Sequence, residues 1–173
     1  MKISRWWFAS WFALVLLASR TSAAQGAVQG RTGFGAGAEA TTTGIIGGTF
    51  VYDAGMFHLD ALLGGAFDHN DSTVAVAGRF FFPLHRSQAA DFSIGPGIGL
   101  VHNSHHPDLV PPVPSTSTDE VHLEGAVQIR AFVVSNVALS ASAGLGIVFV
   151  NGNNRGVIGG QVGASLGITY FFF

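Results

Sequence analysis

The chain has 173 residues, no cysteine and only 10% charged residues, and its mean hydropathy is +0.42. The lack of cysteine excludes disulfides and thiolate metal sites, and no apolar run beyond the N-terminus reaches the roughly 18–20 residues of a membrane-spanning helix. From residue 25 onward, five arginines, no lysine and ten acids give a formal charge of 5 − 10 = −5, which excludes the basic surface of a nucleic-acid-binding protein.

The N-terminus has the layout of a secretory signal peptide. Lys2 and Arg5 precede an apolar core of 13 residues at 6–18, and small residues follow at 22–24. This order predicts a signal peptide at 1–24 and a single domain at 25–173. An uncleaved anchor helix is the alternative, but the short core and the small-residue cleavage site argue against it.

Four strands are predicted between residues 34 and 82, because apolar residues recur there at every second position. Thr41 to Thr43 are predicted as a turn, and Ala54-Gly55 as a two-residue hairpin turn. Pro83 is predicted to end the fourth strand. The four apolar faces lie within residues 34–40, 44–52, 57–67 and 74–82.

Four more strands are predicted in the second half of the chain. The strand at 92–102 contains Pro96, which removes a ladder hydrogen bond and predicts a bulge or a gap in the pairing. Val134 to Asn136 are predicted as a tight turn. The remaining strands lie at 121–131, 137–147 and 158–173, and the last is predicted to pair with the first strand, at Phe34, Ala36 and Ala38.

Eight alternating strands of about ten residues each predict an all-β, transmembrane eight-stranded antiparallel up-and-down β-barrel. A secreted chain without a long apolar helix can cross a lipid bilayer only as a closed barrel, since every backbone polar group must be paired. A soluble calycin-like barrel is the alternative, but it would carry more surface charge. Three polar loops are predicted on the outer side, at residues 68–72, 103–119 and 151–156.

Aromatic residues recur near one end of the predicted strands. A barrel in a membrane carries such a girdle at the lipid–water boundary. Phe67 and Phe149 are candidates for a thinner girdle at the other end. The predicted girdle consists of Phe50, Tyr52, Phe82, Tyr170 and Phe172.

With its signal peptide, eight alternating strands and C-terminal aromatic residue, the chain resembles the small eight-stranded outer-membrane β-barrel proteins of Gram-negative bacteria, the opacity-protein and outer-membrane-protein β-barrel group. The resemblance covers about residues 30–173. It implies a location in the cell outer membrane, in contact with outer-membrane lipid and lipopolysaccharide. It also implies that the barrel assembly machinery reads the C-terminal strand at Phe173, although the apolar face here runs through Tyr170 and Phe172.

Polar side chains on the inward positions predict a network inside the barrel. If Phe67 lies opposite Ser72, then Asp60 lies opposite Arg79, which would give a charge-assisted pair. We interpret the network as filling for a narrow lumen, because eight-stranded barrels are only just wide enough for side chains. The predicted lumen residues are Glu39, His58, Asp60, Arg79, His122, Glu124, Gln128 and Arg130.

Two further groups could carry chemistry. His102, His105 and His106 lie near Asp108, but their spacing is not diagnostic of a metal site, and we expect no metal and no cofactor. His102 and Ser104 form a His-x-Ser pattern that resembles outer-membrane lipid A deacylases, with Glu120 as the local acid.

The sequence therefore predicts a non-enzymatic outer-membrane barrel with a structural or surface-interaction role. A narrow pore for small solutes or ions is one alternative. An outer-membrane lipid A hydrolase is the other. The sequence predicts no catalytic residues for the preferred role.

Overall fold

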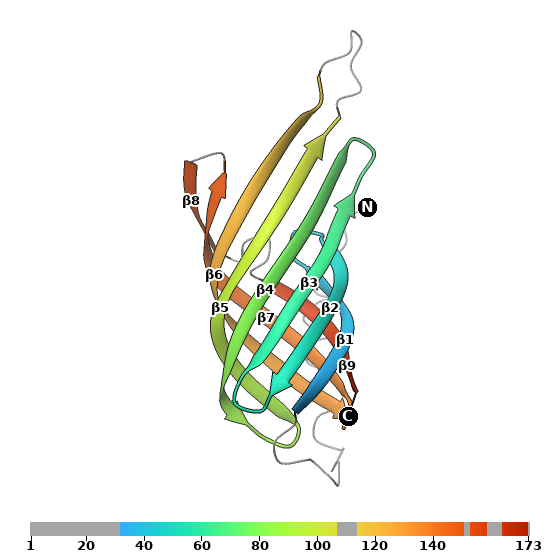
Figure 1. Cartoon of the computed structure of the whole chain (residues 1–173), viewed down its shortest axis with the longest axis vertical. Coiled ribbons are helices and arrows are strands. Elements are labelled where there is room, and N and C mark those ends of the chain that lie inside the picture. The colour runs from blue at the N-terminus through green and yellow to red at the C-terminus, as the bar shows by residue number, and fades with distance from the viewer. Residues whose placement is uncertain (1–31, 107–113, 151–152, 159–163, 173) are drawn as a thin grey trace, which may run out of the picture.

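The computed structural model describes residues 32–106, 114–150, 153–158 and 164–172, which form one closed β-barrel (Figure 1). The predicted signal peptide and Phe173 lie outside the described residues. No helix among the described residues is long and apolar enough to cross a membrane. The strands are β1 Thr32–Thr41, β2 Ile46–Ala54, β3 His58–Phe67, β4 Asp71–Arg86, β5 Ala90–His105, β6 Thr116–Val134, β7 Val137–Val150, β8 Asn153–Ile158 and β9 Ala164–Phe172.

The described strands occupy eight positions around an antiparallel up-and-down barrel. Each of β1 to β7 pairs with the next strand in the sequence, and the β1–β9 and β7–β9 pairings close the circle. Phe34 lies opposite Phe172 and Ala36 opposite Tyr170, which confirms the predicted pairing of the last strand with the first. The predicted fold class is therefore confirmed.

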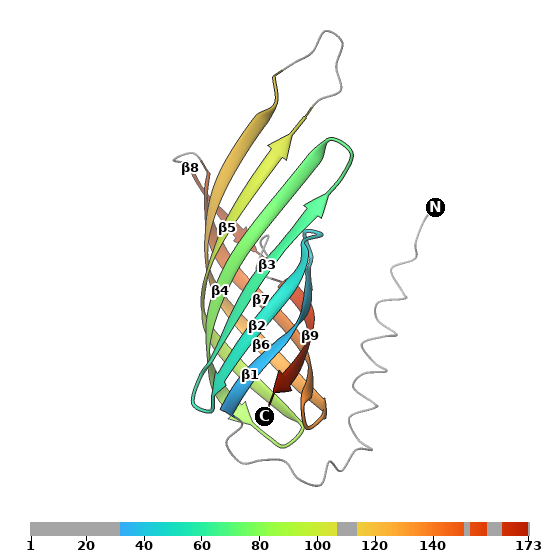
Figure 2. The ribbon, with the colours of Figure 1, turned by 45° about the vertical axis from the view of Figure 1, so that its right-hand side comes forward.

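The two ends of the barrel differ. The lower end in Figure 1 carries the tight connections between β2 and β3, β4 and β5, and β6 and β7, together with the end of β9. The upper end carries the β1–β2 and β3–β4 connections, and β5 and β6 extend there beyond the remaining strands (Figures 1 and 2). We refer to these as the lower and upper ends.

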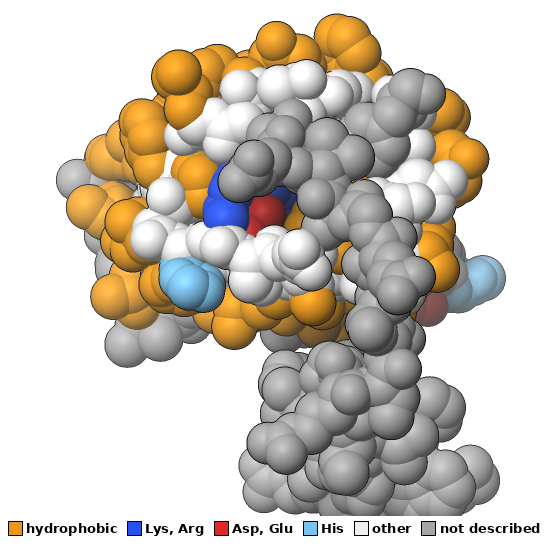
Figure 3. Space-filling model, turned by 90° about the horizontal axis from the view of Figure 1, so that it is seen from below, with side chains coloured by type: hydrophobic (Ala, Val, Ile, Leu, Met, Phe, Trp, Pro, Cys, Tyr) orange, Lys and Arg blue, Asp and Glu red, His pale blue; other side chains and the backbone are white. Residues whose placement is uncertain are grey.

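Side-chain burial alternates along every strand for which it is described, and the apolar residues are on the outside. On β6, Leu123 and Ile129 are 45% and 54% exposed, whereas Gln128 and Arg130 are each 2% exposed. Seen from the lower end, hydrophobic side chains surround the barrel, and basic and acidic side chains lie in its central opening (Figure 3). The apolar faces of the strands thus point outward and the polar faces point into the lumen, as the alternation predicts.

The prediction that Pro83 ends the fourth strand is wrong. β4 continues to Arg86 through a register shift between Pro83 and His85. Pro83 still lies opposite Ser93, and Leu84 is the extra residue of this bulge, which lets β4 continue beyond the proline. The turn to β5 is then short, and Ser87 donates its backbone N–H to Ala90 O at 2.8 Å.

Pro96 lies inside β5, between β4 and β6, and causes a gap in the ladder without a register shift. Arg79 pairs with Gly97 and Phe82 with Ile94, but no pairing joins Phe80 and Phe81 to the residues between them. The neighbouring Gly95 permits a close approach, because an added Cβ would lie 1.7 Å from Phe80 O. The predicted gap is confirmed, and the alternative of a bulge at Pro96 is wrong.

Several predicted connections were too long or shifted. The β2–β3 turn is at Gly55-Met56, not Ala54-Gly55, because Ala54 N–H donates to Phe57 O at 2.9 Å and Gly55 has a φ of +85°. The predicted loop at 103–119 is shorter at both ends, since β5 reaches His105 and β6 begins at Thr116. Within the predicted loops 68–72 and 151–156, β4 begins at Asp71 and β8 at Asn153.

The last predicted strand, at 158–173, is not continuous. β8 pairs with the upper part of β7, with Ile158 opposite Leu145, and β9 pairs with the lower part, with Ala164 opposite Ala143. Between these two pairings the last strand advances six residues, from 158 to 164, while β7 spans only two, from 145 to 143. The last strand therefore has four extra residues. In β9 the outward side chains are Leu166, Ile168, Tyr170 and Phe172.

Candidate functional site

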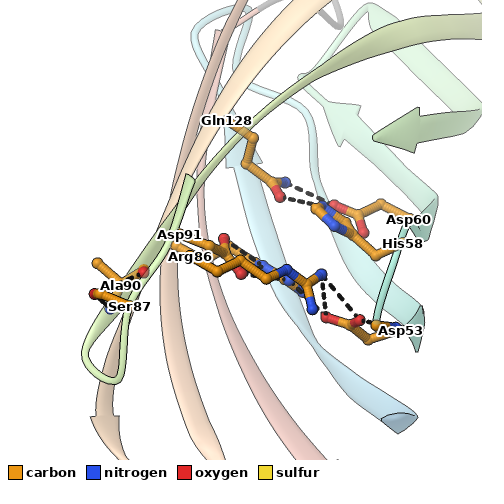
Figure 4. Close-up of polar contacts among 10 residues, drawn as sticks. Asp53, His58, Asp60, Arg86, Ser87, Ala90, Asp91 and Gln128 are labelled. Carbon is orange, nitrogen blue, oxygen red and sulfur yellow. Dashed lines mark hydrogen bonds and ion pairs between the residues drawn. The ribbon is translucent and has the colours of Figure 1, made fainter. Parts of the chain in front are cut away.

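Charged residues from four strands meet in the lower half of the lumen and form what we call the Arg130 cluster. Arg130 Nη2 lies 2.6 Å from Asp53 Oδ2 and 2.6 Å from Asp91 Oδ2. Arg86 Nη2 lies 3.1 Å from the other Asp53 oxygen, as Figure 4 shows for Arg86 and Asp53. Asp53, Asp91 and Arg130 are at most 5% exposed. Buried charges persist in proteins when they are paired in this way.

Aromatic rings support the Arg130 cluster from below. The Arg130 guanidinium carbon lies 5.6 Å from the centroid of the Phe132 ring and 5.9 Å from that of Phe171. Both distances are within the range of a cation–π contact. Phe171 is 2% exposed, so its side chain is inside the barrel, where it packs with Val51 and Ala138.

The middle of the lumen holds the Gln128 bridge, a chain of three polar side chains. Gln128 Oε1 lies 2.7 Å from His58 Nε2, and Gln128 Nε2 donates to Asp60 Oδ2 at 2.6 Å (Figure 4). The His58 ring stacks on Phe81 at 5.1 Å between centroids. Among the described residues, His58 Nδ1 and Asp60 Oδ1 have no hydrogen-bond partner.

Above the Gln128 bridge lies the Arg79 cluster. Arg79 Nη1 donates to Glu39 at 2.7 Å and Arg79 Nε donates to Glu124 at 3.0 Å. The predicted register is confirmed, with Phe67 opposite Ser72 and Asp60 opposite Arg79. The described partners of Arg79 nevertheless come from β1 and β6, because its long side chain reaches across the lumen to them.

A fourth group lies near the upper end of β6. His122 Nε2 lies 3.0 Å from Glu120 Oε2, and both side chains are buried. Asn103 Nδ2 donates to the other Glu120 oxygen at 3.4 Å, and Thr73 donates to Asn103 at 2.7 Å. These hydrogen bonds continue the polar interior to the upper ends of β4, β5 and β6.

The structure brings all eight predicted lumen residues into these four groups, and it adds four charged residues that the prediction missed. Asp53 shares the inward phase of Val51, but no predicted partner drew attention to it. Arg86 and Asp91 were assigned to a connection because Pro83 was expected to end the strand. Glu120 was considered only as the acid beside His102. The inward phase of the neighbouring strand would have found Asp53, Asp91 and Glu120, whereas Arg86 is inward only because the bulge between Pro83 and His85 reverses the phase of β4.

Outward aromatic residues form a band near the lower end. All five predicted girdle residues are outward, and further aromatic residues join them. The band also includes Phe34, Phe57 and Phe80, whose rings pack against its members at 4.7–6.4 Å between centroids. Tyr170 and Phe172 contact each other at 5.4 Å.

Two histidines at the upper end, His102 and His105, each contact an acid. His105 Nδ1 lies 2.5 Å from Asp71 Oδ1, and His102 Nδ1 lies 2.6 Å from Asp119 Oδ1. Asp108 lies outside the described residues. Within the part of the chain that the structure describes, no group of three or more His, Cys, Asp or Glu side chains could hold a metal ion.

Glu120 does not orient His102, contrary to the sequence-based interpretation. Glu120 follows Asp119 by one residue, and consecutive strand residues point to opposite sides of the barrel wall. Glu120 is therefore inside, where it contacts His122. Asp119 lies directly opposite His102 in the β5–β6 pairing and is on the same outward side.

No protein-family model and no curated protein matches this sequence. Among solved structures, the barrel is similar to Neisserial surface protein A (NspA), with a TM-score of 0.52 and 11% identity over 82% of this chain and 95% of that chain. The N-terminal β-barrel domain of Pseudomonas aeruginosa OprF aligns with a TM-score of 0.48 and 15% identity over 83% of this chain and 98% of that chain. The similarity to NspA concerns the fold.

Proposed function

We propose that this protein is a closed, non-conducting barrel of the bacterial outer membrane with a structural or surface-interaction role. The observation that carries the proposal is the inverted distribution of side chains. Large apolar residues such as Leu63, Ile98 and Leu145 are 64%, 52% and 62% exposed, while ion pairs fill the interior. Exposed apolar patches larger than a few hundred Å² indicate a contact with lipid or another apolar surface.

Two kinds of partner follow from this proposal. The apolar belt would contact outer-membrane lipid and lipopolysaccharide. The C-terminal strand β9, whose outward side ends in Tyr170 and Phe172, would be the segment that the barrel assembly machinery binds. The β5 and β6 hairpin at the upper end would then be the tallest surface available to other molecules.

The interior argues against the pore alternative. The Arg130 cluster joins β2, β4, β5 and β6, and the Arg79 cluster joins β1, β4 and β6, so charged side chains cross the lumen at two levels. A permeating ion would have to displace buried, hydrogen-bonded pairs, whose disruption costs about 3–5 kcal/mol each. The lumen is therefore a filled polar core.

Planar-bilayer recordings test this proposal. The purified protein is first shown to be folded and inserted by its faster gel mobility without boiling and by a β-rich circular dichroism spectrum. We expect no conductance steps from the natural protein. The variant Arg79→Ala/Arg130→Ala, in which both clusters lose their central cation, serves as the comparison and is expected to admit ions if it folds. Stable conductance steps from the natural protein would overturn the non-conducting role.

A further inference from the structure

The upper ends of β4, β5 and β6 carry a polar depression on their inner face, which we call the polar cup. Its volume is about 250 Å³, and it lies where β5 and β6 extend beyond the other strands (Figures 1 and 2). Six inward side chains form two rows of three, because residues directly opposite each other in the ladders share a face. The first row is Asp71, His105 and Thr116, and the second row is Thr73, Asn103 and Thr118.

An apolar layer lies directly below the polar cup. The next inward row holds Ala75 and Val101, which are 1% and 2% exposed. Ile45, from the turn between β1 and β2, packs with these two residues, and Ala66 of β3 packs against the same layer. Arg79 is four residues further down β4. A solute that enters the cup from the upper end therefore meets apolar side chains before it meets the Arg79 cluster, which favours binding in the cup over passage through it.

Hydrogen bonds hold the polar groups of the cup in place. Thr73 donates its hydroxyl to Asn103 Oδ1 at 2.7 Å, and Asn103 Nδ2 donates to Glu120 Oε1 at 3.4 Å. In the other row, His105 Nδ1 lies 2.5 Å from Asp71 Oδ1. These side chains are therefore ordered before a ligand arrives, and a preorganised site loses less conformational entropy on binding.

The lining of the polar cup indicates the class of ligand. None of its residues is Lys or Arg, and none is a large apolar residue. An anionic ligand would meet the Asp71 carboxylate without a compensating cation, and an acyl chain would leave the polar groups without partners, which is costly. The lining instead offers carboxylate, imidazole, amide and hydroxyl groups, which together supply both donors and acceptors. A neutral ligand whose own groups donate and accept at close spacing matches this lining.

We propose that the polar cup binds one neutral sugar ring of a carbohydrate. Each hydroxyl of a pyranose both donates and accepts, and the hydroxyls lie on adjacent ring carbons. The two rows are about 7 Å apart along the strands, and neighbouring strands are about 4.8 Å apart, so the patch is the size of a single ring. Asp71 Oδ2 accepts from ring hydroxyls, Asn103 donates to them, and the Thr118 hydroxyl does both. This inference names a partner class for the proposed surface-interaction role and so rests on it.

The chain offers a matched control in His102. His102 is also exposed and also contacts an aspartate, Asp119, at 2.6 Å, but consecutive strand residues point to opposite sides, so it lies on the outer face of β5. His102→Ala removes a His–Asp pair of the same kind at the same end of the barrel. Two variants act on the cup itself. Asn103→Ala removes the centre of the second row, and Thr118→Val keeps the side-chain shape but removes a hydroxyl.

Saturation-transfer NMR on the protein purified from membranes in detergent measures binding. The probes are the methyl glycosides of glucose, galactose, mannose and N-acetylglucosamine, with N-acetylneuraminic acid as an anionic sugar. We expect saturation transfer to at least one neutral glycoside and weaker transfer to N-acetylneuraminic acid. The dissociation constant of the bound glycoside rises roughly tenfold in Asn103→Ala and at least about twofold in Thr118→Val. It is unchanged in His102→Ala.

A second measurement identifies the source of the sugar. Protein in phosphatidylcholine nanodiscs is titrated with the polysaccharide that mild acid releases from lipopolysaccharide, and separately with dextran oligosaccharides. Binding of the first assigns the ligand to the same membrane, and binding of the second alone assigns it to a glycan from outside. No binding of any neutral saccharide to a folded, heat-modifiable protein, or binding that Asn103→Ala and Thr118→Val leave unchanged, would overturn the site. Tighter binding of N-acetylneuraminic acid would overturn the neutral class. The conductance test of the proposed function stands apart from these results, because it depends on the ion pairs below the cup.

Discussion

Replacing Arg130 tests whether the lumen is a tightly packed ionic core. Arg130→Met keeps most of the side-chain volume but removes the charge that holds Asp53 and Asp91, which are 2% and 5% exposed. Asp53 retains Arg86 at 3.1 Å, whereas the contacts described for Asp91 all come from Arg130. The substitution thus leaves one buried carboxylate without its cation.

The expected loss of stability follows from this one unpaired carboxylate. Breaking a buried ion pair by removing one partner costs about 3–5 kcal/mol of unfolding free energy. With a urea slope of about 2 kcal/mol per M, the unfolding midpoint falls by roughly 1.5–2.5 M. Adding Asp91→Asn removes the stranded charge, so the double variant Arg130→Met/Asp91→Asn should recover at least about 1 kcal/mol.

Equilibrium unfolding in urea from lipid vesicles, followed by circular dichroism, measures these changes. Arg86→Met is the matched control, because its side chain is 28% exposed and Asp53 keeps Arg130. We expect it to cost about 1 kcal/mol or less. If Arg130→Met costs no more than Arg86→Met, the lumen charges are hydrated and the reasoning about a sealed ionic core is refuted.

Two further substitutions probe the barrel wall and the lumen. Gly95→Ala would place a Cβ 1.7 Å from Phe80 O and should lower the free energy of unfolding by at least about 3 kcal/mol. The Cβ of Gly78→Ala meets nothing within 4 Å, so this variant should change the free energy of unfolding by less than about 0.5 kcal/mol. Equal losses of stability in gel-shift titrations against urea would contradict the close approach at Gly95. Gln128→Leu removes the donor to Asp60 and should cost about 1–3 kcal/mol, so an unchanged urea midpoint would show that the Gln128 bridge contributes nothing to stability.

The sequence predicted the barrel because alternation is a local property that each strand carries by itself. It placed Glu39, Arg79 and Gln128 inside correctly, since an inward position depends only on the strand's phase. It also predicted the β3–β4 register, because a short polar loop at Asp68 to Asn70 leaves little freedom in how the two strands align.

Partners across the lumen could not be predicted in the same way. Arg79 lies opposite Asp60 in the ladder but reaches Glu39 and Glu124, because lumen contacts depend on side-chain length and barrel radius. Strand ends were also missed where a proline was taken as a boundary, as at Pro83. The sequence therefore left out Asp91, although it has the inward phase of β5, and Arg86, whose inward direction depends on the bulge between Pro83 and His85.

The acid beside His102 shows how a single residue changes a functional interpretation. Glu120 and Asp119 are adjacent in the sequence, and the sequence-based interpretation named Glu120. Only the β5–β6 register decides which of them shares the outward side with His102. The pairing selects Asp119.

The most direct test of the account is a nitroxide scan along β5 in vesicles. The chain has no cysteine, so single cysteines can be placed from Phe92 to Ser104 and labelled. The account predicts that oxygen accessibility is high at Ile94, Ile98 and Leu100 and low at the intervening positions, and that access shifts to a water-soluble relaxant at His102 and Ser104. Uniform aqueous access along β5, or lipid exposure in the opposite phase, would contradict a barrel whose apolar side faces the bilayer.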